Sequence, residues 1–293
     1  MSRKHNLSLN GEVEHFQEAH PLPAAKISER TLQDLLKAID DDEVALPSLP
    51  EVALKVREAA ESPEVSIGQL SSVICTDTAL TARILKVVNS PLLRSGWEIT
   101  DLHAAIGRLG LVYTSNLAVG LAMEQMFRSK SQAVDRKLRL IWSRSLTVAG
   151  VGHAICRRRT DLKADQATLA GIVHKIGVLP ILAYIDQHEL QIAPAELDSL
   201  IDEIHPIIGH RILTQWDFPK QLAEVPRGYL DLARESLHPD YVDVVQAASI
   251  ISSKGCTGRY AKLDWSSVSS LRALALEPGE ASQYLDEAVL LAG

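Results

Sequence analysis

The chain has 293 residues and a formal net charge of −7, from 30 basic and 37 acidic side chains. A net negative charge disfavours a general nucleic-acid scaffold, which usually needs a basic face, so the composition argues against nucleic acid as a partner. Aromatic residues make up only 4% of the chain. A core built from Leu, Ile, Val and Ala favours helices over sheets.

The sequence contains no signal for export or membrane insertion. The first six residues are polar and lead into no apolar segment, and no run approaches about 18 apolar residues. Cys75, Cys156 and Cys256 lie too far apart for a zinc knuckle or a disulfide framework. These features predict a cytoplasmic protein without a membrane partner.

Residues 1–45 are predicted to be an N-terminal extension. Residues 1–27 are polar, and an amphipathic pattern from Ser28 to about Ile39 predicts one short helix. The acidic run Asp40-Asp41-Asp42-Glu43 marks a linker.

Residues 46–127 are predicted to form consecutive short helices. Pro50 suits a first helical turn, and Ser66 with Gln69 has the spacing of a capping box. Asp77 is expected to cap a helix that ends with Asn89 in the left-handed conformation, before Ser90-Pro91.

The first block closes with two more predicted helices. Thr100 is expected to cap one that ends at Gly110, and the other runs from about Val112 to Phe127. A second block of helices follows, with predicted positions near 136–158, 165–174, 178–186, 194–203, 206–216, 219–234 and 240–254. Residues 255–270 are expected to be loop, and 283–291 a terminal helix. No strand pattern of period two is present, so the fold class is all-α.

Several segments, in this order, resemble the HDOD family. The first block contributes Leu46-Pro47-Ser48-Leu49-Pro50, Ile74-Cys75-Thr76-Asp77, Leu80 to Ser90, and Ala105-Ile106-Gly107-Arg108-Leu109-Gly110. The second block contributes Trp142-Ser143-Arg144-Ser145, His174-Lys175-Ile176-Gly177 and His205-Pro206-Ile207-Ile208-Gly209. The resemblance implies an HDOD-like domain over 46–255, with lobes of about 46–127 and 135–255, and a C-terminal extension over 256–293.

The HDOD family is a relative of the HD metal-dependent phosphohydrolases. The resemblance implies an all-helical domain used in bacterial signalling, without demonstrated hydrolytic activity. Active HD enzymes use a His, a His-Asp pair and a distant Asp. At the matching positions this sequence has Arg144, the pair His174-Lys175, and Ser249.

These replacements predict a degenerate site with no metal and no cofactor. A charged lysine has donors but no lone pair, arginine stays protonated, and His174 alone is a weak ligand set. One hypothesis is that Arg144 and Lys175 pair with acidic neighbours and hold helices together. Another is that Arg144, His174 and Lys175 form a pocket for a small anion, with His174 donating a hydrogen bond.

The function predicted is a non-enzymatic signalling output or adaptor module. It would act through a protein partner, with a small anionic ligand as input. One alternative is a true HD-type phosphohydrolase of nucleotides or cyclic nucleotides. Another is a nucleic-acid-binding regulator that uses Arg157-Arg158-Arg159, although that run is expected to complement a helix dipole in solvent.

Two further patterns are interpreted as incidental. His205 and His210 are five residues apart and do not share a helical face, and His205 is expected just before a helix that starts at Pro206. Arg227-Gly228-Tyr229-Leu230 only faintly resembles the Gly-Tyr-Pro of the HD-GYP phosphodiesterases.

Overall fold

The structure, a computed structural model, describes residues 46–90, 93, 96–236, 238–253, 260 and 262–292, together with Lys37. Every regular element within these residues is a helix, which confirms the all-α prediction. The predicted helix from Ser28 to Ile39, apart from Lys37, and Cys256 lie outside the described residues.

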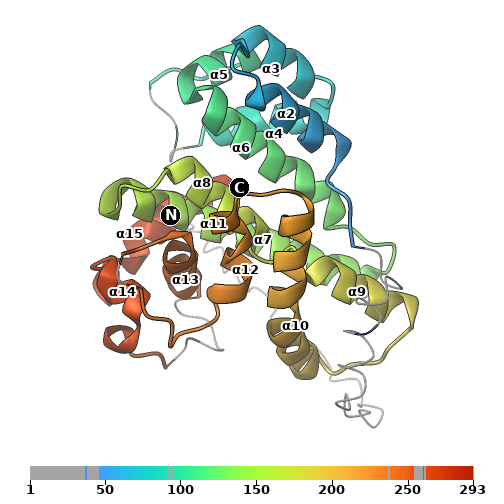
Figure 1. Cartoon of the computed structure of the whole chain (residues 1–293), viewed down its shortest axis with the longest axis vertical. Helices are drawn as coiled ribbons and strands as arrows, with labels where there is room; N and C mark the ends of the chain where they lie inside the picture. The colour runs from blue at the N-terminus through green and yellow to red at the C-terminus, as the bar shows by residue number, and fades with distance from the viewer. Residues whose placement is uncertain are drawn as a thin grey trace, which may run out of the picture.

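The described helices form an upper and a lower group in Figure 1. The upper group is α2 (Glu51–Glu61), α3 (Ile67–Ile74), α4 (Thr78–Val88), α5 (Leu102–Leu109) and α6 (Leu111–Ala122), followed by the 3-10 turn η1 (Met123–Met126). The lower group is α7 (Gln132–Arg159), α8 (Ala164–Val173), α9 (Val178–Gln187), α10 (Pro194–Gln215), α11 (Lys220–Ala223), α12 (Val225–Gly228), α13 (Tyr241–Ser252), η2 (Trp265–Ser267), α14 (Ser269–Ala273), η3 (Pro278–Glu280) and α15 (Ala281–Ala292).

Capping side chains set the helix starts in the upper group. Ser66 Oγ accepts from the backbone N–H of Gln69, and the Gln69 side chain accepts from the N–H of Ser66, so the predicted capping box is present. Asp77 caps α4 as predicted, through the N–H of Leu80. The prediction for α5 is wrong by one residue, because Asp101 rather than Thr100 is its N-cap.

Asn89 ends α4 by a different mechanism from the one predicted. Its φ is −89°, so it is not in the left-handed conformation. Instead its side chain holds the loop that follows: Nδ2 donates to the carbonyl of Ile99 at 2.7 Å, and Oδ1 accepts from the N–H of Ile99 at 2.8 Å. The amide therefore works as a clamp between α4 and the segment before α5.

The lower group differs from the prediction around two prolines. The expected helices at 194–203 and 206–216 are one helix, α10, with Pro206 inside it. His205 consequently lies in a helix interior and is fully buried. The predicted helix over 219–234 is instead the two short helices α11 and α12, because Pro226 occupies the first turn of α12 and restricts the residue before it.

Gly177 brings the turn after α8 against the middle of α10. A Cβ at Gly177 would lie 2.2 Å from the carbonyl oxygen of His205 and 2.5 Å from the backbone nitrogen of Gly209. No larger residue fits that approach without displacing backbone. The glycine thereby sets the position of His174 and Lys175 relative to α10.

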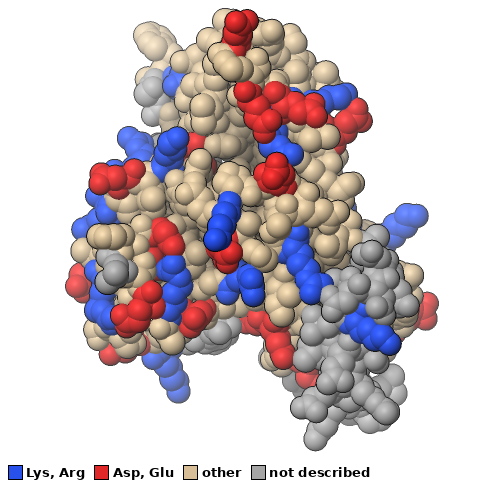
Figure 2. Space-filling view, in the orientation of Figure 1, with Lys and Arg blue, Asp and Glu red and all other residues tan. Residues whose placement is uncertain are grey.

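Two arginines of the run at the end of α7 pair with residues of η3 and α15. Arg158 pairs with Glu287, and Arg159 pairs with Glu280. All three arginines are exposed in the last turn of α7, as predicted, and two of them also join helices. On the face shown in Figure 2, basic and acidic side chains are interspersed.

One apolar stretch, Ala164–Gln187, is long enough by composition to cross a membrane. In the fold it comprises α8, a turn and α9, and 78% of its most apolar window is buried inside the protein. Core helices commonly combine such length and composition, so this stretch is weak evidence for a membrane span.

Candidate functional site

A cavity of about 320 Å³ lies in the lower group of helices. Its wall comes from α7, the turn after α8, α10, the residues that follow α12, and α13. The lining residues are Lys137, Leu140, Ile141, Arg144, Val148, His174, Lys175, Asp198, Ile201, Asp202, Tyr229, Leu230, Ser249, Ser252, Ser253 and Tyr260.

All four positions singled out in the sequence line this one cavity. Arg144 comes from the middle of α7, His174 and Lys175 from the turn that ends α8, and Ser249 from α13. They are spread over more than 100 residues of sequence, so the fold rather than local spacing brings them together. Their convergence supports the alignment to the HD pattern, including the position of Ser249.

His174 is held as a neutral acceptor. Its Nδ1 lies 2.7 Å from the carbonyl oxygen of Gly171, so Nδ1 carries the proton and donates, which leaves a lone pair on Nε2. Burial, and then the charge of Lys175, lower the pKa of His174 to about 3. A neutral ring with this tautomer does not donate to an anion in the cavity. This arrangement disfavours the predicted hydrogen bond from His174 to a ligand, which stays a prediction.

The Lys175 side chain is partly buried and lines the cavity. Burial is the main cause that lowers the pKa of Lys175. Asp202 and, more weakly, Asp198 act in the opposite direction and raise that pKa. Arg144 and Lys137, both on α7, lower it further by repulsion. The amine thus lies among groups of both signs, with burial favouring its neutral form.

The structure shows no interhelical ion pair for Arg144 or Lys175 among the described residues. Lys137 does form an ion pair with Asp198 across the cavity wall. Within the described part of the chain, Arg144 and Lys175 form no ion pair and no hydrogen bond through their side chains. This geometry disfavours the hypothesis that Arg144 and Lys175 are mainly structural.

Two hydroxyl groups of α13 add unused donors to the same wall. Ser249 is 7% exposed, and its Oγ has no hydrogen-bond partner among the described residues. Ser252 Oγ, one helical turn further, is also buried without a partner in that part of the structure. Buried hydroxyls are normally satisfied, so an unsatisfied pair beside a cavity indicates a place for a ligand or water.

Sequence reasoning missed Tyr229, although it lies at the centre of the site. Its ring meets His174 edge-on with 4.8 Å between centroids, and its hydroxyl lies 2.9 Å from His205 Nε2. Tyr229 was set aside with an incidental motif, and His205 was expected outside a helix. The Gly-Tyr pair was visible in the sequence, but only the fold places it beside His174.

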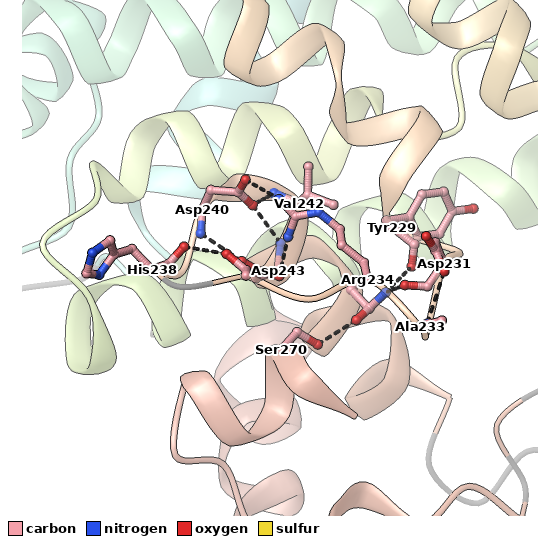
Figure 3. A network of polar contacts seen from close by, with 11 residues as sticks. Tyr229, Asp231, Ala233, Arg234, His238, Asp240, Val242, Asp243 and Ser270 are labelled. Atoms are coloured by element: carbon pink, nitrogen blue, oxygen red, sulfur yellow. Dashed lines mark hydrogen bonds and ion pairs between the residues drawn. The ribbon is translucent and has the colours of Figure 1, made fainter. Parts of the chain in front are cut away.

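A polar network fixes Tyr229 and α13 relative to each other (Figure 3). Gln246 donates through Nε2 to the carbonyl oxygens of Tyr229 and Asp231 and accepts from Ser270 Oγ. Arg234 pairs with Asp240, the N-cap of α13, and with the buried Asp243 (Figure 3). The network therefore holds the residues after α12, α13 and α14 together behind the cavity.

The donor set does not fit the divalent metal of an HD centre. A metal needs several lone pairs held in one geometry, and Lys175 and Arg144 offer none when charged. Among the described residues, no three His, Cys, Asp or Glu side chains gather closely enough to hold an ion. Of the four matching positions, only His174 offers a good metal-ligand atom, the Nε2 lone pair.

The fold and the position of this cavity define an HD-like helical domain. A family model described as the HDOD domain matches residues 46–228, which is more than half of the chain. The chain therefore belongs to the HDOD family. The match begins at the residue where the domain was predicted to start, while the predicted end at 255 stays a prediction.

Solved structures share this fold. A candidate metal-dependent phosphohydrolase from Shewanella amazonensis SB2B superposes with a TM-score of 0.79 at 29% identity, covering 90% of this chain and 97% of that one. An HDOD domain protein of unknown function from Geobacter sulfurreducens gives 0.60 at 20% identity, covering 89% of each chain. A candidate signal transduction protein from Marinobacter aquaeolei VT8 gives 0.62 at 21% identity, covering 92% and 65%.

A curated relative is an uncharacterized protein of Treponema pallidum (strain Nichols), 26% identical over 206 residues. The aligned region is 66% of this chain and 38% of that protein. The chain thus spans well under half the length of this relative.

Proposed function

We propose that this protein is a cytoplasmic signalling output module that acts through a protein partner and uses its cavity as an input site. The observation that carries the proposal is the chemistry of the four matching positions. Arg144, His174, Lys175 and Ser249 line one cavity, but they supply two cations and a hydroxyl where an HD enzyme has metal ligands.

The shared fold is consistent with this role. One structural neighbour is named as a candidate signal transduction protein, and membership of the HDOD family supports a signalling role. A small ligand at the cavity would contact α7, α10 and α13 together, so its binding energy can change how these helices pack. A protein partner that reads their outer surface would respond to that change.

A second function, metal-dependent phosphohydrolysis, is favoured by one specific observation. The Shewanella amazonensis structure with the TM-score of 0.79 carries that name, at 29% identity. In this chain His174 Nε2 retains its lone pair. The Lys175 and Arg144 side chains oppose this function, because a dication beside two cations is repelled in a poorly screened site.

One experiment separates the two functions. The purified protein is measured for bound Mn, Fe, Co, Ni, Zn and Mg by elemental analysis, and for hydrolysis of bis(p-nitrophenyl) phosphate and cyclic nucleotides with each metal added. We expect substoichiometric metal and no turnover above a no-protein blank. A stoichiometric metal together with turnover that is lost in His174→Ala would contradict the proposal and establish the hydrolase.

A pull-down on the same material addresses the partner. The wild-type protein and the double variant Arg144→Ala/Lys175→Ala are used as baits. We expect a protein that is retained by one bait and not by the other, and that rebinds the purified wild-type chain directly. Identical captures by both baits would contradict the use of the cavity as the input of a partner interaction.

A further inference from the structure

The side chains around the cavity are sorted into a polar end and an apolar wall. The polar end combines Arg144, Lys175, Ser249 and Ser252, and the wall includes Leu140, Ile141, Val148, Ile201 and Leu230. We propose that the cavity binds a small molecule with one oxyanion group, a phosphate or a carboxylate, on an apolar body. The oxyanion contacts Lys175, Arg144 and the Ser249 hydroxyl. This inference rests on the proposed use of the cavity as an input site.

The unused groups at the polar end are mostly donors. A protonated lysine offers three N–H donors and an arginine five, and neither side chain accepts. Ser249 and Ser252 add two hydroxyls that can donate. A ligand group rich in lone pairs is the complement of such a set, and charge-assisted bonds to phosphate or carboxylate are the strongest of this kind.

The burial of the Ser249 hydroxyl distinguishes this site from a surface cluster of basic residues. Leaving one buried hydroxyl unsatisfied costs about 1–3 kcal/mol. Ser249 is 7% exposed, and no described group satisfies its Oγ. An oxyanion that accepts from this hydroxyl removes that cost, whereas an apolar group does not.

The charges around the cavity favour a ligand with a single anionic group. Three basic side chains, Lys137, Arg144 and Lys175, and two carboxylates, Asp198 and Asp202, line it, which gives 3 − 2 = +1 when Lys175 is protonated. Lys137 and Asp198 are already paired. The imidazole of His174, which also lines the cavity, is neutral because burial lowers its pKa to about 3. One oxyanion group balances this excess of one positive charge.

The apolar wall sets the rest of the ligand. A volume of about 320 Å³ is larger than an inorganic anion needs and lies at the lower end of small-molecule pockets. The five aliphatic side chains of the wall would stay uncovered beneath a bare phosphate ion. A ring or short chain attached to the oxyanion would cover them and gain their hydrophobic contact.

Titration calorimetry with three probes tests the proposal: inorganic phosphate, phenyl phosphate and benzoate. We expect at least one ring-bearing probe to bind about 10-fold more tightly than inorganic phosphate, because burying the ring on the wall is worth about 1.4 kcal/mol or more. Whichever of phenyl phosphate and benzoate binds more tightly identifies the oxyanion.

Variants assign the binding to the named groups. Lys175→Met and Arg144→Ala are each expected to weaken the better probe about 10-fold or more, and Ser249→Ala about fivefold. The matched control is Arg136→Ala, which removes an exposed arginine of the same helix outside the cavity and should leave affinity unchanged. Melting curves for each variant confirm that it is folded.

The outcomes separate this inference from the proposed function. No saturable binding by any probe, or equal affinities in wild type, Lys175→Met and Arg144→Ala, would overturn the inference and leave the signalling proposal standing. Metal-dependent hydrolysis of phenyl phosphate during the titration would instead overturn the signalling proposal.

Discussion

Helix α7 carries basic side chains in two contrasting environments. At its C-terminal end, Arg158 and Arg159 pair with Glu287 and Glu280 of the last helices. In its middle, Arg144 lines the cavity and forms no ion pair with any described residue. The two sets are less than five helical turns apart on one helix.

The same contrast holds for the buried charges around the cavity. In the first turn of α13, the buried Asp243 is paired with Arg234 (Figure 3). Inside the cavity, Lys175 lies in a desolvated position with no such pair. A run of like charges, conspicuous in the sequence, thus proves to be an interhelical contact, while two isolated cations mark the candidate site. Charges without partners are better evidence for a ligand than charges that are merely clustered.

The largest effect on stability is expected where one partner of a buried ion pair is removed. Asp243→Ala removes a carboxylate that accepts from Arg234 and completes the capping box of α13. We expect the free energy of unfolding to fall by about 3 kcal/mol, as for other buried pairs that lose one partner. Urea denaturation of Asp243→Ala beside the exposed control Asp286→Ala measures this. A loss equal to the control's would remove the distinction between the paired and unpaired regions.

Acid should destabilise the protein through its buried histidines. Burial lowers the pKa of His174 to about 3 and, at the contact of α6, α7 and α8, the pKa of His153 to about 4. Because both values are below the ordinary 6.5, the unfolded chain binds more protons between pH 6.5 and the folded pKa. Stability is therefore complete above pH 6.5 and falls below it. His174 alone should contribute a loss of about 2 kcal/mol at pH 5.

Denaturation at pH 7.5 and pH 5 in wild type and His174→Gln checks this contribution. The neutral amide does not titrate, so the variant should lose less stability between the two pH values than wild type does. Equal losses in both proteins would show that the His174 ring is protonated in the folded state at pH 5.

Replacing Lys175 should raise the free energy of unfolding, whereas breaking an ion pair lowers it. Lys175→Met keeps the length of the side chain and removes a desolvated amine, so we expect a gain of about 1 kcal/mol in unfolding free energy at pH 7. The pKa of Lys175 is lowered in the fold, so the charged amine costs the wild type folding free energy. That cost is full below the folded pKa and fades as the pH rises toward the ordinary lysine pKa. The gain should shrink accordingly in denaturation curves at rising pH. A loss of stability in Lys175→Met would mean that the amine has a structural partner.

The smallest effect is expected at the end of α7. Arg158→Ala/Arg159→Ala breaks two partly exposed ion pairs and should lower the free energy of unfolding by about 1 kcal/mol in total. The affinity of the cavity for the probes should not change. Neither the wild type nor the variant should show salt-dependent binding to duplex DNA. Calorimetry and a DNA shift assay check both. DNA binding that this variant abolishes would revive the nucleic-acid alternative.

The helix caps and the candidate site residues were predictable from the sequence for different reasons. Caps such as Ser66 and Asp77 were predictable because their partners lie three residues away. Arg144, His174, Lys175 and Ser249 were found only through a family pattern, since no local spacing links α7, α8 and α13.

Other features depend on contacts that the sequence does not show. The continuity of α10 through Pro206 was missed, because the tertiary packing of its buried face outweighs the loss of one backbone hydrogen bond. Tyr229 and the Lys137–Asp198 pair were missed because each becomes part of the site only when α7, α10 and the residues after α12 meet.

The central claim is that cations replace metal chemistry in this cavity, and calorimetry with and without metal tests it most directly. Phenyl phosphate is titrated into protein passed over a chelating resin, and again after addition of Mn²⁺. We expect the same dissociation constant in both titrations, and a larger dissociation constant for Lys175→Met. Binding that appears only with Mn²⁺, and that survives in Lys175→Met but not in His174→Ala, would contradict the account.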